Sequence, residues 1–111
     1  MDGDLANLKK LVELKKKHGA YLFVDECHAT GVLGKSLRGT PELYDVEQEV
    51  DVVNSTLGKA MGGGTGGYTT GKKEVIELLR QKGRPYLFSN SIAPSVVAGS
   101  MQAYTLLERD Y

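Results

Sequence analysis

The chain has 111 residues, a length that suits one small domain. Its 14 basic and 14 acidic residues balance to a net charge of zero, so charge gives no support to a nucleic-acid or anionic-membrane partner. No apolar run approaches the roughly 20 residues of a membrane-spanning helix, and the acidic start lacks the features of a signal peptide. A single cysteine excludes an internal disulfide and fits a reducing compartment, so we expect a cytoplasmic protein.

The chain opens with a predicted amphipathic helix over residues 4–18. Leucines recur there at helical spacing, and lysines occupy most of the other face. Asp4 is a candidate N-cap, and Gly19 is a plausible end of the helix. The lysines suit a solvated face near a helix C-terminus, where cations are favoured.

Two short apolar runs then predict buried strands. They are residues 21–24 and 50–53, and continuous apolar runs of this kind are typical of parallel strands covered on both faces. Glycines and a proline divide the intervening segment, residues 29–49, which predicts a loop with a short helix over 42–49.

The remainder predicts strand, helix, strand and helix, over residues 66–70, 72–82, 86–88 and 94–109. Such alternation favours an α/β sheet, mostly parallel, with helices outside it.

Lys59 is the most informative side chain of the sequence. It follows the second predicted strand among small and hydroxyl-bearing residues, although a surface lysine in a flexible glycine loop is the ordinary alternative. Lysine forms Schiff bases with carbonyls, and the hydroxyl of Thr56, three residues earlier, suits a phosphate. Asp25 follows the first strand, at the kind of strand end where α/β sheets bind ligands. Because a carboxylate there can pair with a protonated ring nitrogen, the two side chains predict a pyridoxal phosphate site.

Other polar residues near these strand ends each allow two interpretations. His28 shares a face with Asp25 if the chain turns helically between them, and it would then bond the ring hydroxyl or the carboxylate; isolated histidines are also commonly structural. Ser89 and Asn90 precede the last predicted helix, where they bind an anion or cap the helix. Cys27 has no cysteine partner and no second cluster of ligand types, so no metal site is expected.

The glycine-rich stretch allows a different class of function. Gly62, Gly64 and Gly67 have the spacing of a dinucleotide fingerprint, which needs a strand before it and a helix after it. Because residues 67–70 have strand propensity, a dinucleotide-binding module is the weaker alternative. A non-catalytic module with a vestigial site is the other alternative.

Four motifs, in order, resemble one enzyme family. They are Asp25-Glu26-Cys27-His28-Ala29-Thr30-Gly31, Asn54-Ser55-Thr56-Leu57-Gly58-Lys59-Ala60, Gly66-Gly67-Tyr68-Thr69 and Arg84-Pro85-Tyr86-Leu87-Phe88-Ser89-Asn90-Ser91. Together they resemble the α-oxoamine synthases among the fold-type I (aminotransferase-like) pyridoxal phosphate enzymes, and their wording is closest to the glycine C-acetyltransferase branch. The resemblance implies that residues 1–111 are a fragment of the cofactor-binding large domain, with a mostly parallel sheet and helices on both faces.

The resemblance also implies roles for the matched residues. Lys59 forms the internal aldimine with pyridoxal phosphate, and Asp25 pairs with its pyridine nitrogen. His28 contacts the ring hydroxyl, and Thr56 binds the phosphate. Ser89-Asn90 reaches the phosphate of the neighbouring subunit's cofactor, because members of the family are homodimers with shared sites.

The implied reaction joins glycine to acetyl-CoA and gives 2-amino-3-ketobutyrate and CoA, a step of threonine degradation in its reverse direction. In the family, a residue that stacks on the cofactor ring and an arginine for the substrate carboxylate belong to segments that this chain does not match, so we expect the chain alone to be inactive. Another α-oxoamine synthase, similar to serine palmitoyltransferase, is the nearest alternative.

Overall fold

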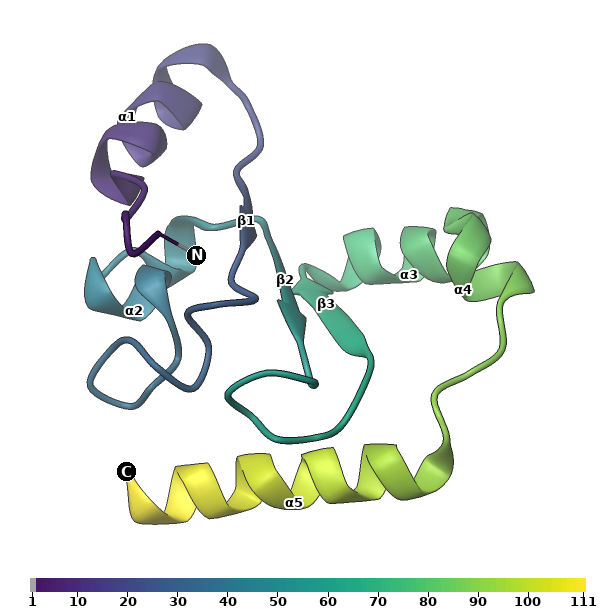
Figure 1. Cartoon of the computed structure of the whole chain (residues 1–111). Helices are drawn as coiled ribbons and strands as arrows, with labels where there is room; N and C mark the ends of the chain where they lie inside the picture. The colour runs from purple at the N-terminus through teal and green to yellow at the C-terminus, as the bar shows by residue number, and fades with distance from the viewer. Residues whose placement is uncertain (1) are drawn as a thin grey trace.

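Helices and short strands alternate along the computed structural model, which describes residues 2–111; Met1 lies outside the described part. The elements, in chain order, are α1 (Leu8–His18), β1 (Phe23–Asp25), α2 (Thr40–Leu43), the 3-10 helix η1 (Glu47–Glu49), β2 (Val52–Thr56), β3 (Gly67–Gly71), α3 (Lys73–Lys82), α4 (Arg84–Phe88) and α5 (Pro94–Asp110), as Figure 1 shows. The α/β class that the sequence predicts is confirmed.

The described strands form one sheet in the order β1-β2-β3. β1 runs parallel to β2, with Asp25 opposite Asn54, whereas β3 runs antiparallel to β2, with Thr69 opposite Asn54. The sheet in this part of the chain is therefore mixed, not mostly parallel. The loop from β2 to β3 is too short for a helical crossover, so the chain must reverse there. The longer connection from β1 to β2 carries α2 and η1, which allows the parallel pairing.

Helix α1 covers the start of the sheet. Its two buried residues pack into an apolar cluster made of Leu8, Val12, Leu22, Val24 and Val46. The helix ends where the sequence predicts, because the next residue is a glycine in the left-handed conformation. Its predicted start at residue 4 is wrong. The helix begins at Leu8, because the preceding asparagine side chain accepts a hydrogen bond from the N–H of Lys10 at 3.1 Å and caps it there.

A buried ion pair fixes α1 to the entrance of β2. Lys15 Nζ lies 2.7 Å from Asp51 Oδ2, and the backbone N–H of Leu22 donates to the same carboxylate at 2.7 Å. Lys15 also donates to the carbonyl oxygen of Glu49 at 2.6 Å. These bonds satisfy a carboxylate that would be costly to bury without partners, and they hold β1 and β2 in register beneath the helix.

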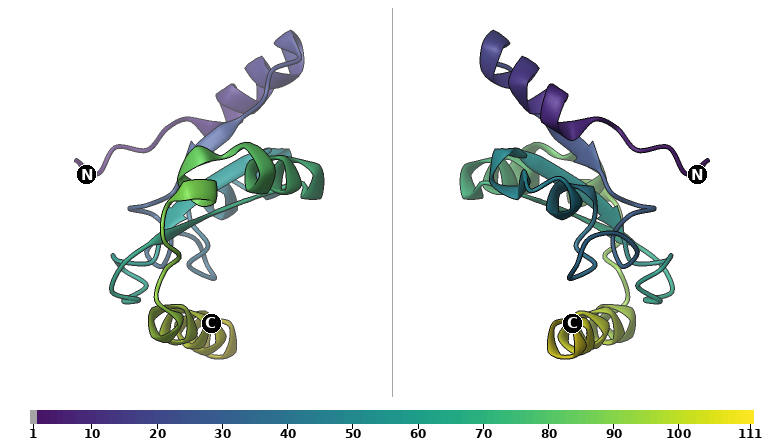
Figure 2. Two further views of the ribbon diagram at one scale, coloured as in Figure 1. Left: turned by 90° about the vertical axis from the view of Figure 1, so that its right-hand side faces the viewer. Right: turned by 90° about the vertical axis from the view of Figure 1, so that its left-hand side faces the viewer.

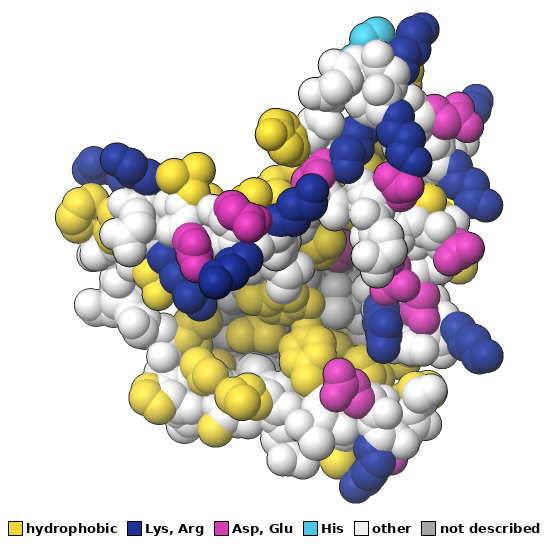
Figure 3. Space-filling view, turned by 180° about the vertical axis from the view of Figure 1, so that it is seen from behind, with side chains coloured by type: hydrophobic (Ala, Val, Ile, Leu, Met, Phe, Trp, Pro, Cys, Tyr) yellow, Lys and Arg dark blue, Asp and Glu magenta, His cyan; other side chains and the backbone are white. Residues whose placement is uncertain are grey.

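Helices lie on both faces of the sheet. On one face, the Tyr104 hydroxyl of α5 donates to the Tyr68 hydroxyl of β3 at 2.6 Å, and the two rings meet edge to face. On the other face, Ile76 and Leu79 of α3 line a pocket with Asn54 of β2. Figure 2 shows α1 and α5 at opposite ends of the molecule, with the sheet between them. Seen from behind, a hollow with apolar side chains lies between α5 and the rest of the chain (Figure 3). An open pocket of about 710 Å³ accounts for it, lined by α5, by β2 and β3, and by residues of the connection between β1 and β2.

The predicted strand over Tyr86–Phe88 is wrong, because these residues form α4. Pro85 suits the first turn of a helix, and Gly83 separates this turn from α3. The guanidinium of Arg84 lies 5.1 Å from the ring centroid of Phe88, four residues later, which further favours a helical turn. A run of three apolar residues carries no period that would distinguish a strand from a helix.

Helix α5 confirms the predicted helix over residues 94–109, and Val96, Tyr104 and Leu107 lie on its half-buried side. Val97 and Met101, which the spacing places toward a core, are exposed, and Ser100 is buried instead. The inward side of the helix therefore combines the larger, half-buried side chains with Ser100, a small residue that lies close to Gly63 of the glycine loop.

Candidate functional site

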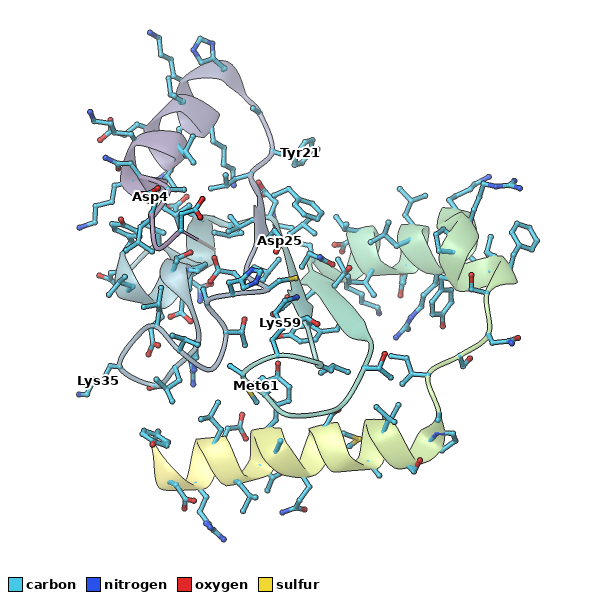
Figure 4. All side chains as sticks on the ribbon, in the orientation of Figure 1. Asp4, Tyr21, Asp25, Lys35, Lys59 and Met61 are labelled. Carbon is cyan, nitrogen blue, oxygen red and sulfur yellow. The ribbon has the colours of Figure 1, made fainter. Side chains whose placement is uncertain are left out.

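The candidate site lies at the carboxyl ends of β1 and β2. Asp25 is the last residue of β1, and Lys59 lies three residues after β2 ends at Thr56. Because these two strands are parallel, their carboxyl ends meet at the same edge of the sheet. Figure 4 shows Asp25 and Lys59 near one another beside these strand ends, whereas Lys35 lies on an outer loop. β2 continues past its predicted end at residue 53, so Thr56 belongs to the strand itself.

The Asp25 carboxylate is held by donors on both of its oxygens. The backbone N–H of Cys27 donates to Oδ1 at 2.9 Å, and the side-chain amide of Asn54 donates to Oδ2 at 3.3 Å. The Cys27 bonds are the main cause that lowers the pKa of Asp25; the Asn54 amide and the positive charge of Lys59 lower it further, against a partial burial that raises it. The carboxylate is therefore ionised at neutral pH, as pairing with a protonated ring nitrogen requires.

Lys59 is exposed to an open pocket of about 860 Å³. Its lining is a mixture of polar groups from the strand ends and apolar groups from α3, α4 and the segment before α5, namely Cys27, Asn54, Ser55, Thr56, Lys59, Gly67, Tyr68, Thr69, Ile76, Leu79, Arg80, Gly83, Pro85, Tyr86 and Ile92. Asp25 is not among them, but both of its hydrogen-bond partners are, and the charge of Lys59 acts on it. The structure thus brings the predicted acid, amine and Thr56 to one region.

The Thr56 hydroxyl is engaged at the base of the glycine loop. It donates to the carbonyl oxygen of Gly66 at 3.1 Å and accepts from the N–H of Gly58 at 3.3 Å. These bonds close the loop that carries Lys59. A phosphate would compete with Gly66 for the hydroxyl proton, so the predicted phosphate contact of Thr56 stays a prediction.

The turn after β1 is helical, as His28 requires if it is to share a face with Asp25. The N–H groups of Ala29 and Thr30 both donate to the carbonyl oxygen of Glu26 at 3.0 Å. His28 is exposed on this turn, three residues from Asp25. Its contact with a ring hydroxyl stays a prediction.

Ser89 and Asn90 are not brought to the Lys59 pocket. Both are exposed in the linker between α4 and α5, and neither lines the pocket. Their predicted contact with a neighbouring subunit's cofactor stays a prediction.

Two polar residues of the site were missed from the sequence. Asn54 donates to Asp25 and accepts at Oδ1 from the Thr69 hydroxyl at 3.1 Å. The alternation of side chains along a strand gave a signal, because Asn54 lies two residues before Thr56 and so shares its face. Thr69 gave none, since its place opposite Asn54 depends on the antiparallel direction of β3.

Glu26 was also missed, and its role is structural. Its side chain is 2% exposed and accepts hydrogen bonds from both the N–H and the hydroxyl of Thr40. It therefore fastens the loop after β1 to the start of α2 and holds the turn that carries Cys27 and His28.

The glycine stretch does not have the geometry of a dinucleotide-binding loop. Gly67 begins strand β3, so the helix that a dinucleotide fingerprint requires does not follow it. Among residues 2–111, no group of three or more His, Cys, Asp or Glu side chains is placed to hold a metal ion. No described helix combines the length and apolar character needed to cross a membrane.

The model of the aminotransferase class I and II family matches residues 1–109. The chain belongs to this family. It is 56% identical over 107 residues to the mitochondrial 2-amino-3-ketobutyrate coenzyme A ligase of Mus musculus and 51% identical over 108 residues to the 2-amino-3-ketobutyrate coenzyme A ligase of Escherichia coli K12. These matches cover 96% and 97% of the chain but only 26% and 27% of the two relatives, so the chain spans about a quarter of their length.

Solved structures agree with this membership. A serine palmitoyltransferase of Sphingomonas wittichii superimposes with a TM-score of 0.88 at 41% identity, over 96% of this chain and 27% of the other. A structure described as SPT with PLP internal aldimine gives a TM-score of 0.86 at 39% identity, over 95% of this chain and 26% of the other. The expected fold is confirmed: the chain has the architecture of a segment of a fold-type I enzyme.

Proposed function

We propose that the chain is the segment of a pyridoxal phosphate-dependent α-oxoamine synthase that carries the cofactor lysine, and that the whole protein is a 2-amino-3-ketobutyrate CoA ligase (glycine C-acetyltransferase). One observation carries the proposal. An ionised carboxylate at the end of β1 and an exposed amine just beyond β2 meet at one edge of the sheet, beside a single pocket. The names of the mouse and Escherichia coli relatives and the PLP named for a structural neighbour support the same assignment.

The residues present fit pyridoxal phosphate. The cofactor has a basic ring nitrogen for Asp25, an aldehyde for Lys59 and a phosphate that suits a hydroxyl and glycine backbone near Thr56. When bound, it supplies an electron sink for a carbanion at the carbon next to the substrate's amino group.

Asp25 and Lys59 would control the protons of the reaction. Asp25, kept ionised by its two donors, would pair with the ring nitrogen and favour its protonated form. Lys59 would bind the aldehyde of the cofactor, and its amine, when free, would serve as a general base for the glycine α-proton. His28 would orient the ring through the ring hydroxyl, and Thr56 would bind the phosphate.

The proposal extends to the whole protein. Residues 1–111 belong to its cofactor-binding large domain, and glycine and acetyl-CoA are its substrates. It acts as a homodimer, in which Ser89-Asn90 reaches the cofactor phosphate of the other subunit; the exposure of this linker supports that role. We assign it to the cytoplasm on its single cysteine, although the mouse relative is named mitochondrial, and cell fractionation distinguishes the two.

Trapping the covalent link tests the cofactor site. Protein mixed with pyridoxal phosphate and reduced with borohydride should carry one phosphopyridoxyl group on Lys59, located by mass spectrometry of the peptides. Lys59→Arg should abolish this adduct. Lys35→Arg, which removes an exposed loop lysine far from the pocket, should leave it unchanged. Labelling spread evenly over the surface lysines would contradict the site.

A substrate comparison tests the reaction. The full-length protein incubated with glycine and acetyl-CoA should release CoA, measured as free thiol. Preference for serine with a long-chain acyl-CoA would instead support an enzyme similar to serine palmitoyltransferase. Retention of NAD without any pyridoxal phosphate adduct would support the dinucleotide-binding alternative.

A further inference from the structure

A row of hydrogen-bonded polar side chains crosses the sheet on the face that carries the pocket. The Thr69 hydroxyl of β3 donates to Asn54 Oδ1 at 3.1 Å, and Asn54 Nδ2 donates to Asp25 Oδ2 at 3.3 Å. The three residues lie directly opposite one another in the pairing of the three strands. The row therefore reaches the acid from the far edge of the sheet.

The direction of the bonds follows from the chemistry of the partners. An ionised carboxylate only accepts hydrogen bonds, so the Asn54 group that faces Asp25 must be the amide NH₂. The Asn54 oxygen then faces Thr69, whose hydroxyl can donate to it. Thr69 thus fixes the amide in the orientation that serves Asp25.

Backbone pairing keeps this contact in place. The N–H of Glu26, the residue after Asp25, donates to the carbonyl oxygen of Asn54 at 2.7 Å. The Cys27 N–H holds the other carboxylate oxygen, so a donor on each side limits rotation of the acid. Each oxygen keeps a lone pair for a further donor.

We propose that Asn54 is a positioning residue that, oriented by Thr69, holds the Asp25 carboxylate in place for the ring nitrogen of the cofactor. This proposal rests on the proposed function for the identity of the ring. Asn54 acts through Asp25 and needs no contact with the reacting atoms. A purely structural role would affect folding alone, whereas the positioning role affects the cofactor's affinity and ring protonation in protein that is fully folded.

The test compares variants of the full-length apoenzyme titrated with pyridoxal phosphate. Asn54→Leu should raise the dissociation constant about tenfold, since it removes a hydrogen bond to a charged group. Asn54→Asp, of nearly the same shape, should raise it at least as much, because it places a carboxylate against Asp25. Thr69→Val should raise it by a smaller factor of about three, because the amide remains but is no longer oriented. Thr70→Val, the matched change on the opposite face of β3, should leave it unchanged.

A second readout separates positioning from folding. The pH titration of the bound cofactor's visible absorption should shift in Asn54→Leu and Thr69→Val relative to Thr70→Val, while far-UV circular dichroism stays the same. The proposal would be overturned if the dissociation constants and titrations of Asn54→Leu and Thr69→Val matched those of Thr70→Val. It would also be overturned if cofactor affinity fell only in variants whose circular dichroism shows lost secondary structure. If Asn54→Leu fails to fold, Asn54→Asp and Thr69→Val decide the question. If the unaltered protein gives no Lys59 adduct, the proposed function fails. The contact between Asn54 and Asp25 can still be tested then, because carbon NMR of the apoprotein measures the pKa of Asp25 with and without Asn54→Leu.

Discussion

At the scale of single residues, the Cys27 thiol and the Asp25 carboxylate share the turn after β1. The hydrogen bond and the negative charge of Asp25, together with partial burial, raise the pKa of the Cys27 thiol. A raised pKa leaves less of the reactive thiolate at a given pH. This favours the unreactive thiol form of Cys27, which lines the same pocket as Lys59.

We therefore predict slow alkylation of Cys27. At pH 8, iodoacetamide should modify it more slowly than an unstructured cysteine peptide. Asp25→Asn removes the charge and should accelerate the reaction several-fold by lowering the thiol pKa, as mass spectrometry can follow over time. Asp45→Asn, a change away from the site, serves as the control. Equal rates in Asp25→Asn and the unaltered protein would show that access alone limits the reaction.

The chemistry of single residues was largely readable from the sequence. Asp25 and Lys59 could be predicted because each follows an apolar run and belongs to a residue type with a specific reactivity. Asn54 could not be connected to Asp25 in the same way, since asparagine is common at strand ends and turns, and its partner is set by register. The roles of His28 and Ser89-Asn90 depend on groups outside the described residues and stay predictions.

At the scale of elements, the glycine loop between β2 and β3 packs closely against α5. A Cβ on Gly63 would collide with the buried Ser100 hydroxyl and would lie 2.8 Å from the carbonyl oxygen of Leu57. The Gly63 N–H also donates to that oxygen at 2.6 Å. The loop that presents Lys59 therefore depends on a missing side chain at this position.

We predict that Gly63→Ala displaces this loop. It should reduce the borohydride-trapped adduct on Lys59 several-fold and lower the melting temperature. Ser100→Ala in the same chain should not restore the adduct, because the Leu57 carbonyl still blocks the added Cβ. Gly99→Ala is the matched control: a Cβ added there would have no neighbour within 4 Å, so the change should be neutral or stabilise α5 by up to about 1 kcal/mol. Recovery of the adduct in the double variant would refute this account of the loop.

The ion pair between α1 and β2 predicts a pH dependence of stability. The hydrogen bonds from Lys15 and from the Leu22 backbone lower the pKa of Asp51. Its contribution to stability is then fully present above the unfolded-state pKa of about 3.9 and is lost as the pH falls through the lower folded-state pKa. Asp51→Asn should reduce the free energy of unfolding by about 2–3 kcal/mol at pH 7 and should flatten this acid dependence, measured by urea denaturation.

A surface pair provides the control for that measurement. Lys73 and Glu77 lie on one exposed side of α3, with their charged atoms 3.7 Å apart. Glu77→Gln should change the free energy of unfolding by less than about 0.5 kcal/mol. An equal effect of the two substitutions would mean that burial of Asp51 is unimportant.

The elements differed in how well the sequence predicted them. α1, α3 and α5 have long apolar periods and were found, although the start of α1 depended on a cap at Asn7 that competes with Asp4. α4 was mistaken for a strand because three apolar residues carry no period. The antiparallel direction of β3 is a matter of connection length, which a strand's own residues do not encode.

At the scale of the whole molecule, large apolar side chains outnumber those that the small core can bury. Tyr21 is 86% exposed and Phe88 73% exposed, on opposite parts of the chain. In relatives about four times longer, much further sequence is available to cover such surfaces. The small core therefore gives the isolated chain only modest stability.

We predict that the isolated chain binds a hydrophobic dye and associates with itself. Its fluorescence with 8-anilinonaphthalene sulfonate should exceed that of the full-length protein several-fold at equal mass. It should also elute ahead of a monomer in gel filtration, because within residues 2–111 the sheet has an unpaired edge at β1. With glycine and acetyl-CoA it should release no thiol. A monomer that binds no dye, or one that turns over substrate, would contradict this expectation.

The pairing of Val24 with Val53 has a consequence for how the acid is chosen. Two carboxylates follow one another in the chain, Asp25 and Glu26. A slip of β1 by one position would turn Glu26 toward the face that carries Asn54 and the pocket, and Asp25 away from it. Such a slip would also expose Leu22 and Val24, which α1 covers, and would break the buried hydrogen bond from Thr40 to Glu26. The apolar packing of one face of β1 therefore fixes the register of the strand. That register determines which of the two neighbouring acids lies on the opposite face, beside Asn54.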